Sequence, residues 1–291
     1  YVPEFFSKFK SKLFQTTRFH VPNLYRAPKN MTAKEFEDTC IKNIENILST
    51  DNSIAVFVME SGAQVAGGVI IYPPGFQKRI NNICKKYNVL FVLDEIATGF
   101  GRLGSMIEYT RENCTPDIVS YGKMLTGGYL TLASTLTSKK ISNSFLGNFD
   151  DMKHLFHGHT YTGNPIATSL ALRNLELYQQ KKLIKKIQKT SKIFINRRKE
   201  FYDLDLVGDV RHKGMLMGIE LVSNKNNKTP IRTKKSINNV IFEEGKKHSI
   251  FFRTLGNIIM LVPPLAISEK ELNFLIDGTI KTIKGISKKI I

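Results

Sequence analysis

The hydrophobic residues of this chain fall into short continuous runs separated by segments with helical spacing. Ile54 to Met59 reads IAVFVM and Val89 to Leu93 reads VLFVL, and neither run alternates with polar residues. Continuous apolar runs of this length predict strands that are buried on both faces of a parallel sheet. Between the two runs, Pro73 and Pro74 precede a segment with apolar residues at helical spacing. Strand, helix and strand in this order predict a βαβ unit.

Further elements of the same sheet are predicted on both sides of this unit. Thr32 followed by Glu35 is the pattern of a capping box, which predicts a helix that begins there. The run from Asp117 to Tyr121 predicts a weaker strand. The β-branched run TLASTLTS, with the apolar Leu130 just before it, predicts another. The fold class is therefore α/β, with a mostly parallel sheet flanked by helices.

The pattern changes at Pro165, where leucines recur on one face opposite a lysine-rich face. This spacing predicts one or two amphipathic helices. Gly208 to Leu221 is predicted to form a strand hairpin, and Ile237 to Gly245 a short helix. We therefore predict a large domain over residues 1–168 and a smaller α+β C-terminal domain over residues 169–291.

Composition agrees with a globular protein of this size. The chain has 291 residues, of which 42% are hydrophobic, enough for one large domain and a smaller one with a sizeable buried core. No apolar stretch approaches the roughly 20 residues that a membrane span needs, and we expect neither a span nor a signal peptide. Cys40, Cys84 and Cys114 form no close pair and no metal-binding spacing, which predicts free thiols in a reducing, cytoplasmic compartment.

The formal net charge of +18 raises the question of nucleic-acid binding. The basic residues are spread from Lys8 to Lys289 and form no single patch interleaved with aromatic residues, so a lysine-rich surface is the favoured interpretation. A nucleotide hydrolase would need a phosphate loop in which Ser or Thr follows Gly-Lys, whereas Lys123 is followed by Met124. The basic helical segment 181–199 could lie on a membrane surface, but a solvated helix is favoured.

Two ionisable residues are the first candidates for chemistry. Asp94 directly follows the run Val89 to Leu93, at the strand end where open α/β sheets bind their ligands. Lys123 follows the next predicted strand and precedes a glycine pair. Taken singly, an aspartate there can also cap a helix or bind Mg²⁺, and a lysine in a glycine-rich loop is more often a surface charge. If both are functional, they converge on one crevice.

Three motifs then occur in order: DEIATGFGR (94–102), SYGKMLTGG (120–128) and HGHTYTGNP (157–165). Together they resemble the class III pyridoxal phosphate aminotransferases. Within that family, the sequence TLASTLTS is most similar to the branch that acts in biotin synthesis. The resemblance implies a fold-type-I transferase with pyridoxal 5′-phosphate as cofactor. It also implies that Lys123 links covalently to the cofactor aldehyde and transfers protons, while Asp94 keeps the pyridine nitrogen protonated.

The third motif is implied to act across a dimer interface. In the family, the residues that match His159 and Thr160 contact the cofactor phosphate of the partner subunit, and the glycine that matches Gly158 lies against the substrate. The resemblance thus implies a homodimer with shared active sites. His154 and His157 are close by, but no cysteine or carboxylate completes a metal site there, so we predict none.

Arg253 stands between two apolar runs, where its planar guanidinium would suit either a substrate carboxylate or an internal salt bridge. The resemblance implies that Arg253 binds the carboxylate of 8-amino-7-oxononanoate, while S-adenosylmethionine or, in some relatives, lysine donates the amine. Another class III enzyme, acting on ornithine, 4-aminobutyrate or a related ω-amine, would keep Asp94 and Lys123 but not this role. Met260 and Ser61 depart from the tyrosine and proline that relatives carry.

The start of the chain lacks a glycine loop for the cofactor phosphate, and Tyr1 is not an initiator methionine. The resemblance places this start well inside the cofactor domain. We therefore expect the chain to cover about the last two-thirds of a family member. The phosphate loop and the aromatic residue that stacks on the cofactor ring would then lie outside it. Accordingly, we predict that the 291 residues alone are inactive.

Overall fold

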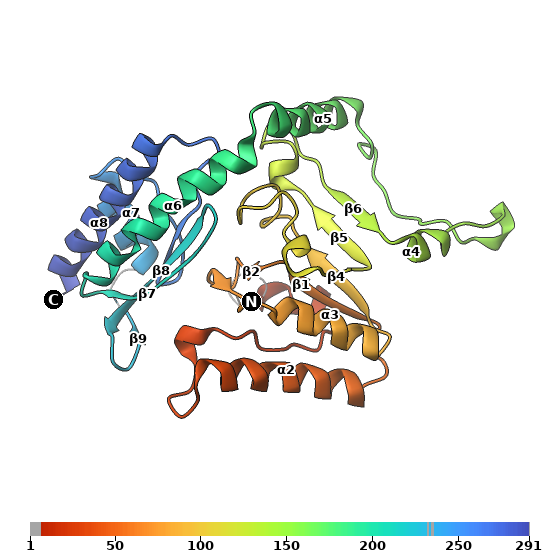
Figure 1. Ribbon diagram of the computed structural model, residues 1–291, viewed down its shortest axis with the longest axis horizontal. Coiled ribbons are helices and arrows are strands. Elements are labelled where there is room, and N and C mark those ends of the chain that lie inside the picture. The colour runs from red at the N-terminus through yellow and green to blue at the C-terminus, as the bar shows by residue number, and fades with distance from the viewer. Residues whose placement is uncertain (1–6, 232, 234–235, 291) are drawn as a thin grey trace.

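The computed structural model describes residues 7–231, 233 and 236–290 (Figure 1). Its first long helix, α2 (Ala33–Thr50), begins at the predicted capping box. The Thr32 hydroxyl accepts a hydrogen bond from the Glu35 amide at 3.2 Å, and the Glu35 carboxylate accepts one from the Thr32 amide at 2.7 Å. Both amides would otherwise lack a partner in the first turn, so the capping-box prediction is confirmed.

The first sheet has the strand order β1-β4-β5-β6, from β1 (Val56–Glu60) through β4 (Leu90–Asp94) and β5 (Ile118–Tyr121) to β6 (Ser134–Thr137). The first three strands are parallel and β6 is antiparallel. Helix α3 (Phe76–Lys86) connects β1 to β4, which confirms the predicted βαβ unit. The last strand is shorter than predicted and excludes Leu130, whose carbonyl accepts the Thr126 hydroxyl in the preceding turn.

One prediction about this sheet was wrong. The runs Ile54–Met59 and Val89–Leu93 were expected to be buried on both faces. No residue of the second run is exposed, but β1 alternates between buried and exposed residues. Helices α2 and α3 pack on the face that carries Phe57 and Phe91. On the other face, Val56 and Val58 are 42% and 57% exposed, because no described element covers them. Apolar composition was therefore a poor guide to burial on that face.

The second sheet is antiparallel, with the order β10-β11-β8-β7, and its strands are β7 (Val207–Lys213), β8 (Leu216–Asn224), β10 (Arg253–Leu255) and β11 (Ile258–Leu261). Strands β7 and β8 form the predicted hairpin, and β9 (Thr229–Pro230) adds to β8. The core between this sheet and its helices contains Phe194, Phe201 and Ile276. Those helices are α6 (Leu183–Tyr202), α7 (Ile237–Lys246) and α8 (Glu269–Ile290).

Helix α5 (Pro165–Gln180) leads from the first sheet into α6 (Figure 1). The parallel sheet with its helices and the separate antiparallel sheet confirm the predicted α/β class. The remaining elements are short: η1 (Ser7–Lys12), η2 (Leu24–Arg26), β2 (Ala63–Gln64), β3 (Ile70–Ile71), η3 (Tyr109–Glu112), η4 (Lys123–Leu125), α4 (Lys139–Asn143) and η5 (Phe149–Asp151).

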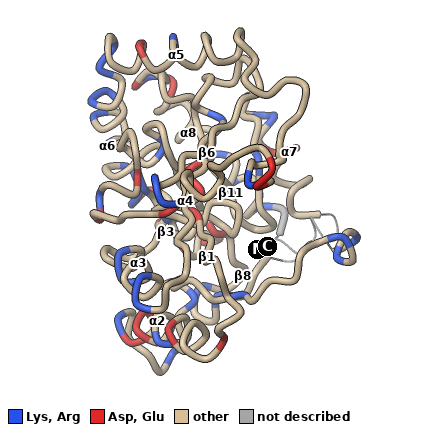
Figure 2. Tube along the Cα trace, turned by 90° about the vertical axis from the view of Figure 1, so that its right-hand side faces the viewer, with Lys and Arg blue, Asp and Glu red and all other residues tan. Residues whose placement is uncertain are grey.

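Charged residues are distributed over many elements of the structure. Figure 2 shows lysines and arginines on α2, α3 and α6, with acidic residues interspersed on α2. Several of the exposed charges form ion pairs, such as Lys86 with Glu45 and Arg173 with Glu176. None of the helices in the described part of the chain is long and apolar enough to cross a membrane.

Candidate active site

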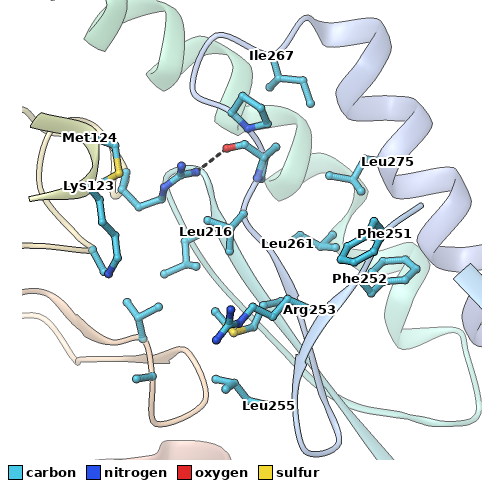
Figure 3. Close-up of a pocket in the computed structure, with 18 of the residues that line it drawn as sticks. Lys123, Met124, Leu216, Phe251, Phe252, Arg253, Leu255, Leu261, Ile267 and Leu275 are labelled. Carbon is cyan, nitrogen blue, oxygen red and sulfur yellow. Dashed lines mark hydrogen bonds between the residues drawn. The ribbon is translucent and has the colours of Figure 1, made fainter. Parts of the chain in front are cut away.

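A cavity of about 1030 Å³ lies between the carboxyl edge of the parallel sheet and the antiparallel sheet (Figure 3). Residues from both sheets line it. Asp94 comes from the parallel sheet and Lys123 from the turn that follows β5, whereas Leu216, Arg253 and Met260 come from the antiparallel sheet. The structure therefore brings together three of the residues that the sequence singled out, although they are spread over 160 positions of the chain.

Asp94 is the last residue of β4, and its position follows from the strand register. It lies beside Glu60 at the end of β1 and beside Ser120 in β5. One Asp94 oxygen accepts a hydrogen bond from the Ile96 amide at 2.8 Å, which fixes the side chain at the sheet edge. Because Asp94 lines the cavity, its carboxylate can face a bound group there.

Lys123 begins η4, two positions after the last residue of β5, and has a backbone φ of +44°. A left-handed conformation is uncommon for a lysine, and such strain often occurs at functional sites. Asn174 holds the turn, since its amide nitrogen donates to the carbonyls of Met124 at 2.7 Å and Leu125 at 3.1 Å. Figure 3 shows the Lys123 side chain at the cavity. No group in the described part of the chain forms a hydrogen bond or ion pair with its ammonium.

Arg253 lies on the opposite side of the cavity, at the start of β10, where it pairs with Met260 of β11 (Figure 3). Its side chain is exposed to the cavity. Among residues 7–231, 233 and 236–290, no carboxylate forms a salt bridge with it. The internal salt bridge that the sequence left open is therefore not found in this part of the chain, and the guanidinium remains available for an external anion.

Sequence reasoning did not assign roles to Glu60 and Arg102, which also line the cavity. Glu60 accepts a hydrogen bond from the Val65 amide at 3.0 Å. Burial raises the pKa of Glu60, and the nearby Asp94 adds to this increase. Arg102 is almost fully buried and donates to the carbonyls of Met215 at 2.9 Å and Pro263 at 2.8 Å. Burial lowers the pKa of Arg102 to about 10.

Glu95, directly after Asp94, has a structural role that the sequence did not reveal. It is fully buried, and its two carboxylate oxygens accept the amides of Glu108 at 2.9 Å and Tyr109 at 2.7 Å. Burial raises its pKa. The signal for Glu95 was present in the sequence as an acidic pair after an apolar strand. Local spacing, however, does not indicate which of two adjacent carboxylates faces a cavity and which holds a loop.

Gly158, His159 and Thr160 do not line this cavity. They belong to the exposed excursion between η5 and α5, which extends away from the two sheets (Figure 1). The His159 amide donates to the Thr162 hydroxyl at 2.9 Å, and the ring nitrogen of His159 accepts the Tyr161 amide at 3.1 Å. His154 packs against the rings of Phe149 and Phe156. In the described residues, no group of three or more His, Cys, Asp or Glu side chains could hold a metal ion.

Comparison with known proteins gives a consistent result. Residues 6–283 match the family described as aminotransferase class-III. The adenosylmethionine-8-amino-7-oxononanoate aminotransferase of Aquifex aeolicus is 39% identical over 98% of this chain and 63% of its own length. The enzyme of that name from Staphylococcus aureus is 40% identical over 100% of this chain and 62% of its own length.

A solved structure agrees with these sequence relatives. The crystal structure of adenosylmethionine-8-amino-7-oxononanoate aminotransferase from Methanocaldococcus jannaschii superimposes with a TM-score of 0.87 at 37% identity. The match covers 97% of this chain and 63% of that one. The chain thus spans a little under two-thirds of the length of the relatives that it matches.

Proposed function

The chain belongs to the class III aminotransferases, and from this premise we propose that the protein containing it is a pyridoxal phosphate-dependent aminotransferase of biotin biosynthesis. Its amino acceptor is 8-amino-7-oxononanoate and its product is 7,8-diaminononanoate, as the names of the two relatives suggest. One observation carries the proposal: Asp94, Lys123 and Arg253 line one cavity, and no described carboxylate forms a salt bridge with Arg253. We assign residues 1–168 to the cofactor domain and residues 169–291 to the smaller domain.

The residues of this cavity fit pyridoxal phosphate. When bound, the cofactor supplies an aldehyde that links to amines and a protonated ring that accepts the electrons of a breaking C–H bond. Lys123 presents an amine without a partner among the described residues, which can hold the aldehyde covalently and then carry a proton at its Nζ. Asp94 presents a carboxylate at the strand end, which can hold the proton on the ring nitrogen.

Arg253 provides the recognition element for the acceptor. Its guanidinium can bind a carboxylate through two parallel hydrogen bonds. The wall of the cavity that holds Arg253 and Lys123 is largely apolar and includes Val65, Leu255 and Met260. A substrate with a carboxylate at one end, a ketone toward the other and a methylene chain between them matches this arrangement of charges and apolar surface.

We propose a homodimer in which the excursion before α5 reaches the partner subunit. Large apolar side chains of η5 and of this excursion are exposed in the single chain, among them Phe149, Leu155 and Phe156. Contiguous exposure of this kind is typical of interaction sites. Gly158, His159 and Thr160 would then complete the partner's site. The three buried free cysteines suit a reducing cytoplasm.

The first test is an absorbance spectrum of the protein containing this chain after addition of pyridoxal phosphate. We expect the visible band of the lysine-linked cofactor, and a shift of that band when S-adenosylmethionine donates its amine. Lys123→Ala should lose the band and reduce turnover by about 10²–10⁴-fold. Lys185→Ala, at an exposed position of α6, is the matched control and should retain both. No band in the wild type would refute the proposal, whereas a shift with lysine alone would change only the donor.

A second test addresses Arg253. Arg253→Met should raise the KM for 8-amino-7-oxononanoate by about 10- to 100-fold, because a charge-assisted pair to the carboxylate is lost. The half-reaction with the amino donor should be unaffected. If instead the variant leaves this KM unchanged and an ornithine or 4-aminobutyrate substrate is turned over, the substrate assignment is wrong while the cofactor chemistry stands.

A further inference from the structure

The turn between β2 and β3, residues Val65 to Val69, forms one wall of the cavity and has a strained backbone. Val65 and Ala66 line the cavity. At the other end of the turn, Gly68 has φ +116° and Val69 has φ +56°. A left-handed conformation is strongly disfavoured for a β-branched residue and persists only where the surroundings enforce it. Val69 is fully buried, so the groups that enforce this conformation belong to the protein that surrounds it.

Arg211, from β7 of the other sheet, holds the strained end of the turn. Its Nη2 donates to the Gly68 carbonyl at 2.8 Å and its Nε donates to the Val69 carbonyl at 3.1 Å. The guanidinium is itself fixed, since Nη1 donates to Asp209 at 2.9 Å and to Glu220 at 2.7 Å. The Arg211 side chain is 9% exposed, so water competes little for these bonds. All three nitrogens of the fork are therefore engaged.

The strained end is connected to the cavity wall through the backbone of the turn. The Val65 carbonyl accepts the amides of Gly68 at 3.2 Å and Val69 at 3.0 Å. The Val65 amide donates to Glu60, which lines the cavity beside Asp94. A displacement of Val69 would thus be transmitted to Val65 and Ala66 by two hydrogen bonds. Arg211 itself does not line the cavity.

We propose that Arg211 is a positioning residue that holds the turn Val65 to Val69 in place and so determines how well the cavity fits its amino acceptor. It acts through Val65 and Ala66 and not by contact with the substrate. The effect on 8-amino-7-oxononanoate rests on the function proposed above, whereas the effect on the turn does not. Arg211 therefore controls the affinity for the apolar part of the acceptor more than the chemical step at Lys123.

Arg26 offers a matched control within the same network. It pairs with the other oxygen of Glu220 and donates to the Lys228 carbonyl at 2.7 Å. It does not contact the turn. Arg26→Met and Arg211→Met each remove an arginine from Glu220, but only the second removes donors from Gly68 and Val69. Arg211→Lys is the conservative variant, because it keeps the positive charge. It should replace the arginine only in part, since a single ammonium cannot reach two carbonyls and two carboxylates in the way that the fork does.

The experiment combines hydrogen exchange with steady-state kinetics on the cofactor-loaded protein. In Arg211→Met, we expect amides in residues 61–72 to exchange at least about tenfold faster, because two charge-assisted bonds are lost. The KM for 8-amino-7-oxononanoate should rise about tenfold while kcat changes less than about threefold. Arg26→Met should show neither effect. Arg211→Lys should shift both quantities less, and it carries the test if Arg211→Met does not fold.

The outcomes separate the two proposals. Unchanged exchange in residues 61–72 of both Arg211 variants overturns the positioning role, whatever the kinetics show. A KM increase in Arg26→Met as large as that in Arg211→Met also overturns it, because the cause would then be the general loss of charge pairing at Glu220. Faster exchange in the Arg211 variants together with a wild type that does not use 8-amino-7-oxononanoate supports the positioning of the turn and refutes the proposed substrate.

Discussion

Two glycines in hairpin turns of the second sheet have the same backbone conformation but different surroundings. Gly214, between β7 and β8, has φ +60°, and Gly256, between β10 and β11, has φ +56°. A Cβ added at Gly256 would meet nothing within 4 Å. A Cβ at Gly214 would lie 2.4 Å from the carbonyl carbon of Leu103 and 2.6 Å from the carbonyl oxygen of Arg102. Replacing each glycine by alanine thus separates backbone strain from steric overlap.

The expected magnitudes follow from this comparison. The left-handed conformation costs an alanine about 1–2 kcal/mol, and this cost applies to both variants. A gain of about 0.4–1 kcal/mol from the less flexible unfolded chain is also common to both. Gly214→Ala bears an additional overpacking cost of about 1–3 kcal/mol, since the overlapping atoms belong to the backbone and cannot rotate away. We therefore expect Gly214→Ala to be less stable than Gly256→Ala by about 2 kcal/mol.

Urea unfolding monitored by circular dichroism measures this difference, and activity provides a second readout. Gly214→Ala should also lower the activity proposed for the protein, because the Met215 amide donates to the Arg102 carbonyl at 2.8 Å and the next residue, Leu216, lines the cavity. Gly256→Ala, which overlaps with nothing, is the control for the strain common to both. Free energies of unfolding that agree within about 0.5 kcal/mol would show that the hairpin does not dock tightly against Arg102 and Leu103.

Two further predictions concern single side chains. Thr32→Ala removes the capping box of α2 and should cost about 1 kcal/mol in the free energy of unfolding. A loss no larger than that of Thr50→Ala, at the opposite end of the helix, would contradict it. Burial and Asp94 raise the pKa of Glu60, so its contribution to stability is complete below its ordinary pKa of 4.5 and is lost as the pH rises through the raised pKa. Glu60→Gln should therefore gain stability relative to the wild type as the pH rises above about 4.5, and a difference that stays constant with pH would refute the sign.

The sequence was informative wherever the physical cause lies within a few residues. A capping box depends on two side chains three positions apart, and the structure contains it at Thr32 and Glu35. The βαβ unit follows from two apolar runs with a helix between them, and parallel pairing then places Asp94 at the sheet edge. Lys123 could be predicted near Asp94 because both follow strands of one sheet. Local patterns thus sufficed to predict which sheet edge borders the cavity.

Burial on the second face of β1 could not be predicted in the same way. Val56 and Val58 are apolar, but their exposure depends on which elements cover that face. Such coverage is a property of the tertiary arrangement. The apolar run indicated a strand correctly and its surroundings incorrectly, because strand propensity and burial both favour the same β-branched residues.

The walls of the cavity show the same limit more sharply. Arg102 donates to the carbonyl of Pro263, 161 residues away, and Arg211 donates to that of Gly68, 143 residues away. Both acceptors are backbone carbonyls, which every residue carries, so no pattern of side chains marks them. That Asp94, Lys123 and Arg253 line one cavity could therefore be predicted in part from residue type and position relative to the strands. The arginines that hold its walls became recognisable only when the two sheets were seen together, and that is where we expect the fit to the substrate to be determined.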